Sequence, residues 1–420
     1  MKKASLFLVC IILLSISCQK DTILFEAEKN NKISKSYTLD GDYRWNLLMP
    51  SILGTHSDGL LTLPENWNAL PNRYLVFYAH GMVEYDYPVV LPNDFIGDKS
   101  IEQFVKEMGM GYATTSYGAN GLVAHRAVEE VRMLVLEVNK IFEDHSNPMQ
   151  EDYIAPPDNI FLVGYSEGGL TTVLTIERYA DLFDGAISIC GPIGSFYDQL
   201  QYWGDFNVLF NYFFEEDLRF YHQYIGNPQD GVGDSTIQRW NEGVRPLELQ
   251  WLINIVLEEN PEKVKQLLQC ARIKLDKDEP DASHEVIFEL LRYNVKLTNE
   301  IITRFFCPAL DNVDTWYSGS YDDTLLNNNI QRVSSPSLKE LVMDKDFQPT
   351  GLIDIPLINI HNTNNPIIPY WHTKEYKSLI KENKKKDLYT EIKVKDFGHS
   401  TLQASYLTDA LSLLIEEVNK

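Results

Sequence analysis

Residues 159–171 read Asn-Ile-Phe-Leu-Val-Gly-Tyr-Ser-Glu-Gly-Gly-Leu-Thr. The stretch opens with a short apolar run of the kind that forms a buried β-strand. Gly164-Tyr165-Ser166-Glu167-Gly168 then matches the pattern G-x-S-x-G, which predicts a sharp turn between a strand and a helix. The glycines let strand and helix approach without Cβ clashes, while the serine takes a strained backbone conformation. The pattern therefore predicts an exposed serine hydroxyl at a helix N-terminus.

Such a hydroxyl is suited to nucleophilic attack, because unpaired N–H groups at the helix N-terminus can stabilise a developing oxyanion. The alternative is a Gly/Ser turn without chemistry. The strand before Ser166 and the helix expected from Leu170 to Leu182 favour catalysis. In this arrangement the residue after the nucleophile, Glu167, supplies one oxyanion N–H. The loop after another strand supplies the second, which we assign to Met82.

The composition limits the possible functions. With 420 residues, of which 44% are hydrophobic, the chain can bury a large core. The formal net charge of −23 argues against a nucleic-acid-binding surface, because nucleic acids are polyanions. The sequence contains no HExxH, CxxC, P-loop or dinucleotide fingerprint, so it predicts no metal and no cofactor.

The first residues have the pattern of a targeting segment. Two lysines precede an apolar run from Leu6 to Ile16 that is too short to span a bilayer. Leu14-Ser15-Ile16-Ser17-Cys18 follows and resembles a bacterial lipoprotein signal, which implies that Cys18 is lipidated after cleavage. We expect a signal at 1–18 and a polar tether at 19–33. The alternative is an ordinary secretory signal with a chance cysteine; both predict export, and the first predicts a lipid anchor in the bacterial cell envelope.

Three further cysteines follow the tether. Cys190 ends an apolar run and is expected to be a buried small hydrophobe. Cys270 and Cys307 either pair, as an exported protein allows, or remain free thiols.

The rest of the chain alternates between apolar runs and helical patterns. An entry strand or hairpin is expected at Tyr37–Met49. The further expected strands are Arg73–Ala79, Gly111–Tyr117, Gly185–Cys190, Pro356–His361 and Tyr389–Val394, with helices at Ile101–Met108, Ala124–Phe142, Tyr370–Asn383 and Leu402–Val418. This order predicts a mainly parallel sheet with helices on both faces. The sheet core spans 34–194 and 346–420, and a helical cap is inserted at 195–345. The cap begins with many aromatic residues, most of which should pack a core while some line a substrate cleft.

Together these features resemble the α/β-hydrolase superfamily, in particular its secreted bacterial members with esterase or peptidase activity and a helical cap. Four motifs carry the resemblance: His80-Gly81, the G-x-S-x-G turn, the segment from His361 to Pro369, and Gly398-His399. The resemblance implies that Ser166 is the nucleophile and that His399 is the general base. For His80 we prefer a structural role in its turn over a chemical one.

The acid of the expected triad departs from the family pattern. The family usually has aspartate two residues before an apolar pair and proline, whereas Asn364-Asn365-Pro366-Ile367-Ile368-Pro369 has Asn365 in that position. An asparagine brings no charge to stabilise the imidazolium, so weaker catalysis is expected. The alternative is a relocated carboxylate, either Asp396 or one of Asp322 and Asp323 in the cap.

The sequence therefore predicts an exported serine hydrolase that cleaves a small or oligomeric ester or amide through an acyl-enzyme intermediate. An ester is favoured, because the cap is helical and no propeller-like repeats precede the catalytic part. A serine peptidase is the first alternative. The second is a ligand-binding lipoprotein whose triad has decayed, for which Asn365 is the support.

Overall fold

The computed structural model describes residues 34–37, 42–54, 56–218, 222–233, 236–237, 240, 245–275, 282–343, 347–399 and 402–420. Lys32–Lys420 forms one compact unit. The expected signal at 1–18 with Cys18 and the tether at 19–33 lie outside the described residues. Within the described ranges, no helix has both the length and the hydrophobicity needed to cross a membrane.

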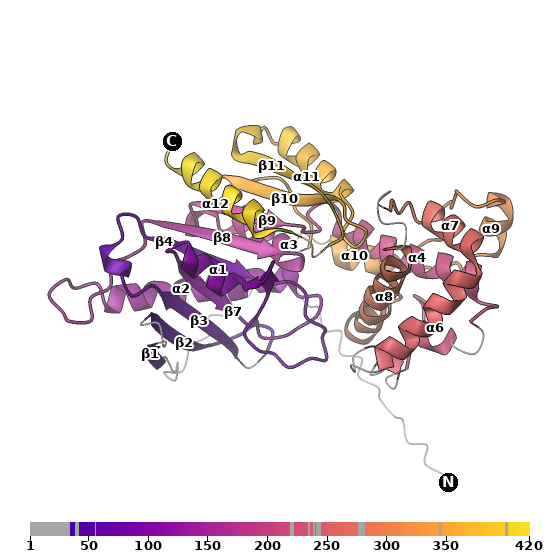
Figure 1. The fold of residues 1–420 in the computed structure, drawn as a ribbon, viewed down its shortest axis with the longest axis horizontal. Coiled ribbons are helices and arrows are strands. Elements are labelled where there is room, and N and C mark those ends of the chain that lie inside the picture. Colours follow the sequence, from indigo (N-terminus) through magenta and orange to yellow (C-terminus); the bar gives the residue numbers. More distant parts are fainter. Residues whose placement is uncertain are drawn as a thin grey trace, which may run out of the picture. The chain divides into compact units, whose positions relative to one another are not determined.

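A nine-stranded sheet runs through the described residues in the order β1-β2-β3-β7-β4-β8-β9-β10-β11 (Figure 1). Its strands are β1 (Ser34–Tyr37), β2 (Tyr43–Met49), β3 (Ser57–Leu63), β4 (Tyr74–Ala79), β7 (Gly111–Thr115), β8 (Asn159–Tyr165), β9 (Gly185–Ile189), β10 (Leu357–Asn364) and β11 (Tyr389–Phe397). Strands β1, β2, β3 and β7 pair antiparallel, and every neighbouring pair from β7 to β11 is parallel. A small separate ribbon joins β5 (Phe95–Ile96) to β6 (Lys99–Ser100). The mainly parallel sheet confirms the predicted fold class.

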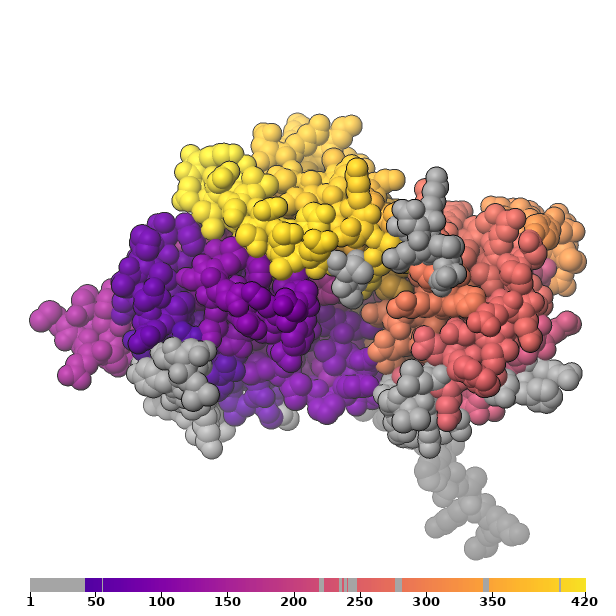
Figure 2. Space-filling view, in the orientation of Figure 1, coloured from indigo at the N-terminus to yellow at the C-terminus, as the bar shows by residue number. Residues whose placement is uncertain are grey.

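Helices cover both faces of the sheet, because alternate strand residues point to opposite sides. On β4, Leu75 and Phe77 pack toward α2 (Ala124–Asp144), α3 (Glu167–Arg178) and α11 (Trp371–Glu382). Val76 and Tyr78 of the same strand pack toward α1 (Ile101–Glu107) and α12 (Ala404–Val418). In Figure 2 the C-terminal residues, in yellow, lie directly against purple residues from the first half of the chain. Short 3-10 turns lie at η1 (Trp67–Ala69), η2 (Ala180–Leu182), η3 (His222–Tyr224) and η5 (Lys386–Leu388).

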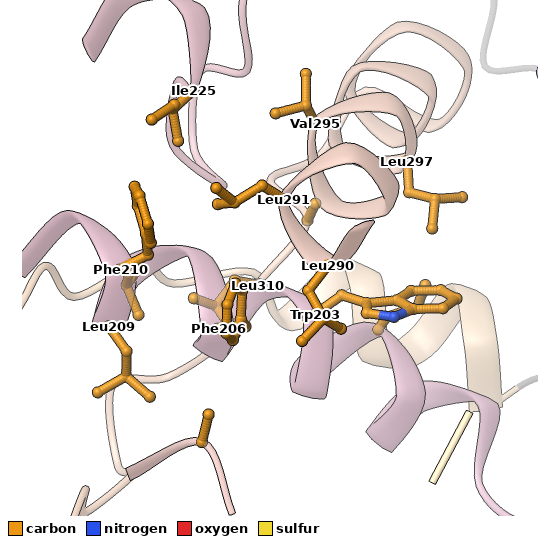
Figure 3. Close-up of a cluster of buried hydrophobic side chains, with 14 of the residues drawn as sticks. Trp203, Phe206, Leu209, Phe210, Ile225, Leu290, Leu291, Val295, Leu297 and Leu310 are labelled. Carbon is orange, nitrogen blue, oxygen red and sulfur yellow. The ribbon is translucent and has the colours of Figure 1, made fainter. Parts of the chain in front are cut away.

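A helical segment connects β9 to β10. It contains α4 (Phe196–Phe214), α6 (Arg245–Glu259), α7 (Pro261–Cys270), α8 (Ser283–Phe305), α9 (Asp323–Asn329) and α10 (Pro336–Met343). Its interior is built largely from α4 and α8, and Figure 3 shows Trp203, Phe206 and Phe210 of α4 close to Leu290 and Leu291 of α8. These aromatic side chains are buried, so the aromatic-rich stretch mainly packs a core, as the sequence predicted.

The sequence did not predict β3. β3 begins with Ser57 and Asp58 and contains Gly59, so it lacks the continuous apolar run that marks the other strands. Gly59 is nevertheless well placed, because an added Cβ would come within 3.0 to 3.2 Å of Met49, Leu47 and Leu134 side-chain atoms. Packing of β2 and α2 against this position, which sequence periodicity does not reveal, selects the strand.

The cysteines in the described residues are buried and free. Cys190 is buried at the end of β9, as predicted. Cys270 and Cys307 do not pair, so the free-thiol alternative holds in this structure. Burial raises the pKa of the Cys270 thiol to about 11.

Candidate active site

The turn at Ser166 has the strained geometry that the sequence predicted. Ser166 lies between β8 and α3 with φ 56° and ψ −121°, a backbone conformation that non-glycine residues rarely adopt. An added Cβ on Gly164 would lie 2.0 Å from the Gly168 carbonyl oxygen. One on Gly168 would lie 2.0 Å from the Ala79 carbonyl oxygen. The two glycines are therefore required for β8, α3 and β4 to meet at this turn.

The fold brings Ser166, His399 and Asn365 into one hydrogen-bonded chain. His399 follows β11, and its Nε2 atom lies 2.9 Å from the Ser166 Oγ. Asn365 follows β10, and its Nδ2 atom lies 2.9 Å from the His399 Nδ1. Tyr165 positions the histidine loop, because its hydroxyl donates to the His399 carbonyl oxygen at 2.5 Å. The three residues predicted from separate parts of the sequence thus meet in the order of a catalytic triad.

Two backbone N–H groups lie beside the serine. Gly81 passes so close that an added Cβ would be 3.4 Å from the Ser166 Cβ, which brings the loop carrying Met82 against Ser166. Glu167 is the first residue of α3, where backbone N–H groups have no intrahelical acceptor. Among the described residues, neither the Met82 nor the Glu167 N–H donates to a protein acceptor. Both N–H groups therefore remain candidate oxyanion donors.

The orientation of the Asn365 amide sets the tautomer of His399. Asn365 Oδ1 accepts hydrogen bonds from the backbone N–H groups of Ile367, at 3.1 Å, and Ile368, at 3.0 Å. A flipped amide would turn its NH2 group against these two donors, so the orientation is fixed. The NH2 group therefore donates to His399 Nδ1, and the ring proton resides on Nε2. In this tautomer Nε2 donates to Ser166 and cannot accept the serine proton.

The electrostatic surroundings also keep His399 neutral. Burial, followed by the charge of His361, lowers the pKa of His399 to about 3. No carboxylate contributes to this pKa, and in the described part of the chain Asp396 forms no hydrogen bond with His399. The structure therefore does not support Asp396 as a relocated acid of the triad.

The two acids proposed from the helical segment are engaged elsewhere. Asp322 caps α9 by accepting from the Leu325 N–H at 2.9 Å. Asp323 accepts from the hydroxyl of Ser320 at 2.6 Å.

His80 has the structural role that was preferred from the sequence. Its ring is buried and stacks on Tyr117 with centroids 4.0 Å apart. His80 Nδ1 donates to the Gly81 carbonyl oxygen at 2.7 Å. These contacts fix the turn that carries Met82, and burial lowers the pKa of the imidazole.

Helix α4 holds the loop that carries Asn365. The Tyr202 hydroxyl donates to the Pro366 carbonyl oxygen at 2.6 Å. The Gln199 side-chain amide donates to the Ile367 carbonyl oxygen at 3.0 Å. The sequence gave no sign of these contacts, because α4 and the loop are far apart along the chain.

The Glu167 side chain joins the serine turn to the start of α2, where Glu300 of α8 also binds, and the sequence did not indicate these contacts. Glu167 Oε1 accepts from the N–H groups of Val123, at 2.9 Å, and Ala124, at 3.0 Å. Glu300 of α8 accepts from the preceding N–H, that of Leu122, at 2.7 Å. Burial and the nearby Glu300 raise the pKa of Glu167 to about 8, and burial raises the pKa of Glu300 to about 7.

Two of the cavities that border the helical segment differ in their position relative to Ser166 and His399. One, of about 250 Å³, opens beside His399 and is bounded by α8, the loop at Pro366 and Ile367, and Phe397. The other, of about 520 Å³, lies among α4, the residues around Trp316 and the start of α11, and includes neither Ser166 nor His399. The first cavity is therefore the candidate substrate pocket. Its α8 lining was not predicted, because the sequence indicated only that some aromatic residues at the beginning of the cap line a cleft.

The strand order and the serine turn decide the fold. The chain has an α/β-hydrolase fold. No family model matches the sequence, and no curated protein matches it. In the described residues, no group of three or more His, Cys, Asp or Glu side chains is arranged to hold a metal ion.

Solved structures of both esterases and peptidases resemble this chain at low sequence identity. An acylaminoacyl peptidase from Pyrococcus horikoshii is 10% identical, with 93% of this chain and 48% of that chain covered and a TM-score of 0.44. The esterase LipA from Xanthomonas oryzae, as a G231F mutant, is 10% identical, with 92% and 97% covered and a TM-score of 0.42. Acetyl xylan esterase 1 from Thermoanaerobacterium is 10% identical, with 93% and 88% covered and a TM-score of 0.39. The chain thus spans about half the length of the peptidase and most of the length of both esterases.

Proposed function

We propose that the protein is a serine hydrolase that cleaves an ester, in preference to an amide, through an acyl-enzyme intermediate. The observation that carries the proposal is the strained Ser166 at the start of α3 with its Oγ 2.9 Å from His399 Nε2. Catalysis by an activated serine requires a nucleophile and a base within hydrogen-bond reach, with the base oriented by a third group. All three positions are filled here, the third by Asn365.

In the proposed reaction, Ser166 Oγ attacks the acyl carbon and its proton passes to His399 Nε2. The N–H groups of Met82 and Glu167 stabilise the oxyanion. His399 then protonates the leaving group, and a water molecule hydrolyses the acyl-enzyme with the same base. No cofactor takes part in these steps.

The base needs its ring proton on Nδ1 before it can accept a proton from Ser166. Moving the proton there sets Nδ1–H against the Asn365 NH2 group, which must rotate away and lose the bonds to Ile367 and Ile368. Two hydrogen bonds are worth about 1–3 kcal/mol together. We therefore expect slow turnover rather than none.

A fluorophosphonate probe tests the proposal directly, because it forms a covalent bond only with an activated serine. The wild-type protein should label, and Ser166→Ala should not. Turnover of p-nitrophenyl butyrate should be lost in the same variant while circular dichroism and melting temperature stay unchanged. Labelling or turnover that persists in Ser166→Ala would refute the assignment of the nucleophile.

A second candidate function is ligand binding by a hydrolase fold with an inactive triad. The observation that favours it is the donor group of Asn365 against His399 Nδ1, which holds the unproductive tautomer. A wild-type protein that binds small esters in the cavity beside His399 without labelling or turnover would establish this function instead.

For the location of the protein we propose the bacterial cell envelope, with Cys18 as a lipidated anchor. The support is the sequence pattern before Cys18 and the polar stretch that follows it. A serine peptidase remains the alternative activity, and an aminopeptide panel beside the ester panel distinguishes the two.

A further inference from the structure

The cavity beside His399 has an asymmetric lining. Helix α8 contributes Glu285, Val286, Glu289 and Tyr293. Because residues three and four apart share one face of a helix, these side chains form a single stripe along α8. The opposite wall is apolar and comes from the core, with Pro366, Ile367 and Phe397 beside His399. The cavity therefore has an apolar wall and, facing it, a wall that carries two carboxylates.

Among the described residues that line this cavity there is no lysine or arginine. The cations that follow along α8 are engaged with Glu84 of the core: Arg292 lies 2.9 Å from its carboxylate, and Lys296 binds the same oxygen. Arg292 also contacts Glu289 at 3.2 Å, which holds that carboxylate in place. Glu285 is exposed and has no ion pair with a described residue. His399 itself stays neutral, because burial lowers its pKa.

The position of the cavity identifies the part of the substrate that it receives. In acyl transfer by a serine, the histidine Nε2 protonates the leaving group, so the leaving group lies on the histidine side of the serine. Here His399 lines the cavity, and its Nε2 atom lies 2.9 Å from the Ser166 Oγ. The cavity that includes His399 is therefore the leaving-group pocket of the proposed hydrolase.

We propose that the preferred substrates are esters whose leaving group carries a positive charge, such as a substituted ammonium alcohol. The proposal rests on the hydrolase function proposed above and names its substrate class. The apolar wall accepts the alkyl part of such a leaving group, and the carboxylates of Glu285 and Glu289 attract the charge. One pair of partly exposed opposite charges corresponds to a preference of about tenfold.

Acetylcholine and 3,3-dimethylbutyl acetate form a matched pair for the test, because they have nearly the same shape and differ in charge. The wild-type protein should hydrolyse acetylcholine with a kcat/KM about tenfold above that of the neutral ester. The double variant Glu285→Gln/Glu289→Gln should lose this preference, because its KM for acetylcholine rises toward its KM for the neutral ester. Glu416→Gln, an exposed acid on α12 outside the cavity, is the control and should keep the wild-type preference.

The outcomes distinguish a failure of the proposed substrate class from a failure of the proposed hydrolase function. Equal rates for the two esters, or faster hydrolysis of the neutral one, overturn the proposal while the hydrolase function stands. If Ser166 is neither labelled nor active toward either ester, the hydrolase function fails, and choline binding measured by titration calorimetry then tests the pocket alone. Absence of choline binding, or binding that the double variant retains, overturns the charge recognition.

Discussion

The Asn365 amide determines which nitrogen of His399 carries the proton, so Asn365→Asp is the most informative perturbation of this site. In the variant, one carboxylate oxygen keeps the hydrogen bonds from the N–H groups of Ile367 and Ile368. The other oxygen replaces Nδ2 at about 2.9 Å from His399 Nδ1 and can only accept. The ring proton therefore moves to Nδ1, and the Nε2 lone pair faces the Ser166 hydroxyl.

The expected gain follows from the charge that the substitution introduces. A carboxylate about 4 Å from the imidazolium centre stabilises it by roughly 4 kcal/mol at an effective dielectric constant of 20, which corresponds to about a thousandfold in rate. In a serine-protease triad, the reverse substitution costs about 10⁴ in kcat. Part of the gain is offset because the position is 4% exposed and the carboxylate is desolvated. We expect kcat to rise by a factor of about 10 to 1,000.

The pH profile and the histidine NMR signals check the mechanism of this gain. Wild-type His399, with its pKa lowered to about 3, stays neutral throughout pH 5–9, so the wild-type rate should show no acid limb there. The new carboxylate raises the pKa of His399, so the variant should lose activity as the pH falls toward 5. Nitrogen-15 correlation spectra should show the proton on Nε2 in the wild type and on Nδ1 in the variant.

Two matched variants complete the experiment. Asp396→Asn should leave kcat unchanged, because Asp396 forms no hydrogen bond with His399 in the described residues. Ser166→Ala in the Asn365→Asp background should abolish turnover, which excludes a contaminating esterase. A folded Asn365→Asp protein without a gain, together with collapse of activity in Asp396→Asn, would refute the argument from the Asn365 amide.

Three further predictions concern stability and location. Glu167→Gln should stabilise the protein at pH 8.5 and have little effect at pH 5. Because the pKa of Glu167 is raised to about 8, the native state keeps a proton that the unfolded chain releases above about pH 4.5, so the stability of the wild type falls as the pH rises toward about 8. Urea unfolding at several pH values measures this, and an equal pH dependence of the unfolding free energy in wild type and variant would contradict it. Phe210→Ala should lower the free energy of unfolding by about 3–5 kcal/mol, because Phe210 is 1% exposed in the core of the helical segment. A loss below about 1 kcal/mol in urea titration would contradict this and show that neighbouring side chains fill the cavity. Cys18→Ala should move the protein from the membrane to the soluble fraction, as measured by ultracentrifugation, and membrane association of a non-aggregated variant would indicate another anchor.

Much of the sheet could be predicted from the sequence because its central strands are buried on both faces. Such strands appear as continuous apolar runs, as at Leu75–Ala79 in β4 and Ile160–Val163 in β8. β3 was not predicted because contacts with other elements, and not its local sequence, stabilise it. Gly59 is acceptable in this strand because Leu47 and Met49 pack over it. The order of the strands likewise follows from crossovers that local sequence does not specify.

The site was predictable where backbone connectivity fixes it. Ser166 follows a strand and begins a helix, and His399 lies between the last strand and the last helix, so their meeting follows from the order of elements. The role of Asn365 was only partly predictable, since its amide orientation depends on the N–H groups of Ile367 and Ile368. The α8 wall of the cavity was not predictable, because a helical pattern does not tell which loop the helix will face.

Glu167 and Glu300 bind three successive N–H groups at the start of α2, one carboxylate from the serine turn and one from α8. The pKa of Glu167 therefore depends on the position of α8, since the nearby Glu300 of α8 contributes to the raised pKa of Glu167. Thermodynamic coupling is reciprocal. Any ligand whose binding displaces α8 must change the protonation of Glu167, and its measured affinity must vary with pH by the same factor. In calorimetry the measured binding enthalpy then depends on the ionisation enthalpy of the buffer. The slope of this dependence gives the number of protons exchanged on binding, which reports on the displacement of α8 without a label.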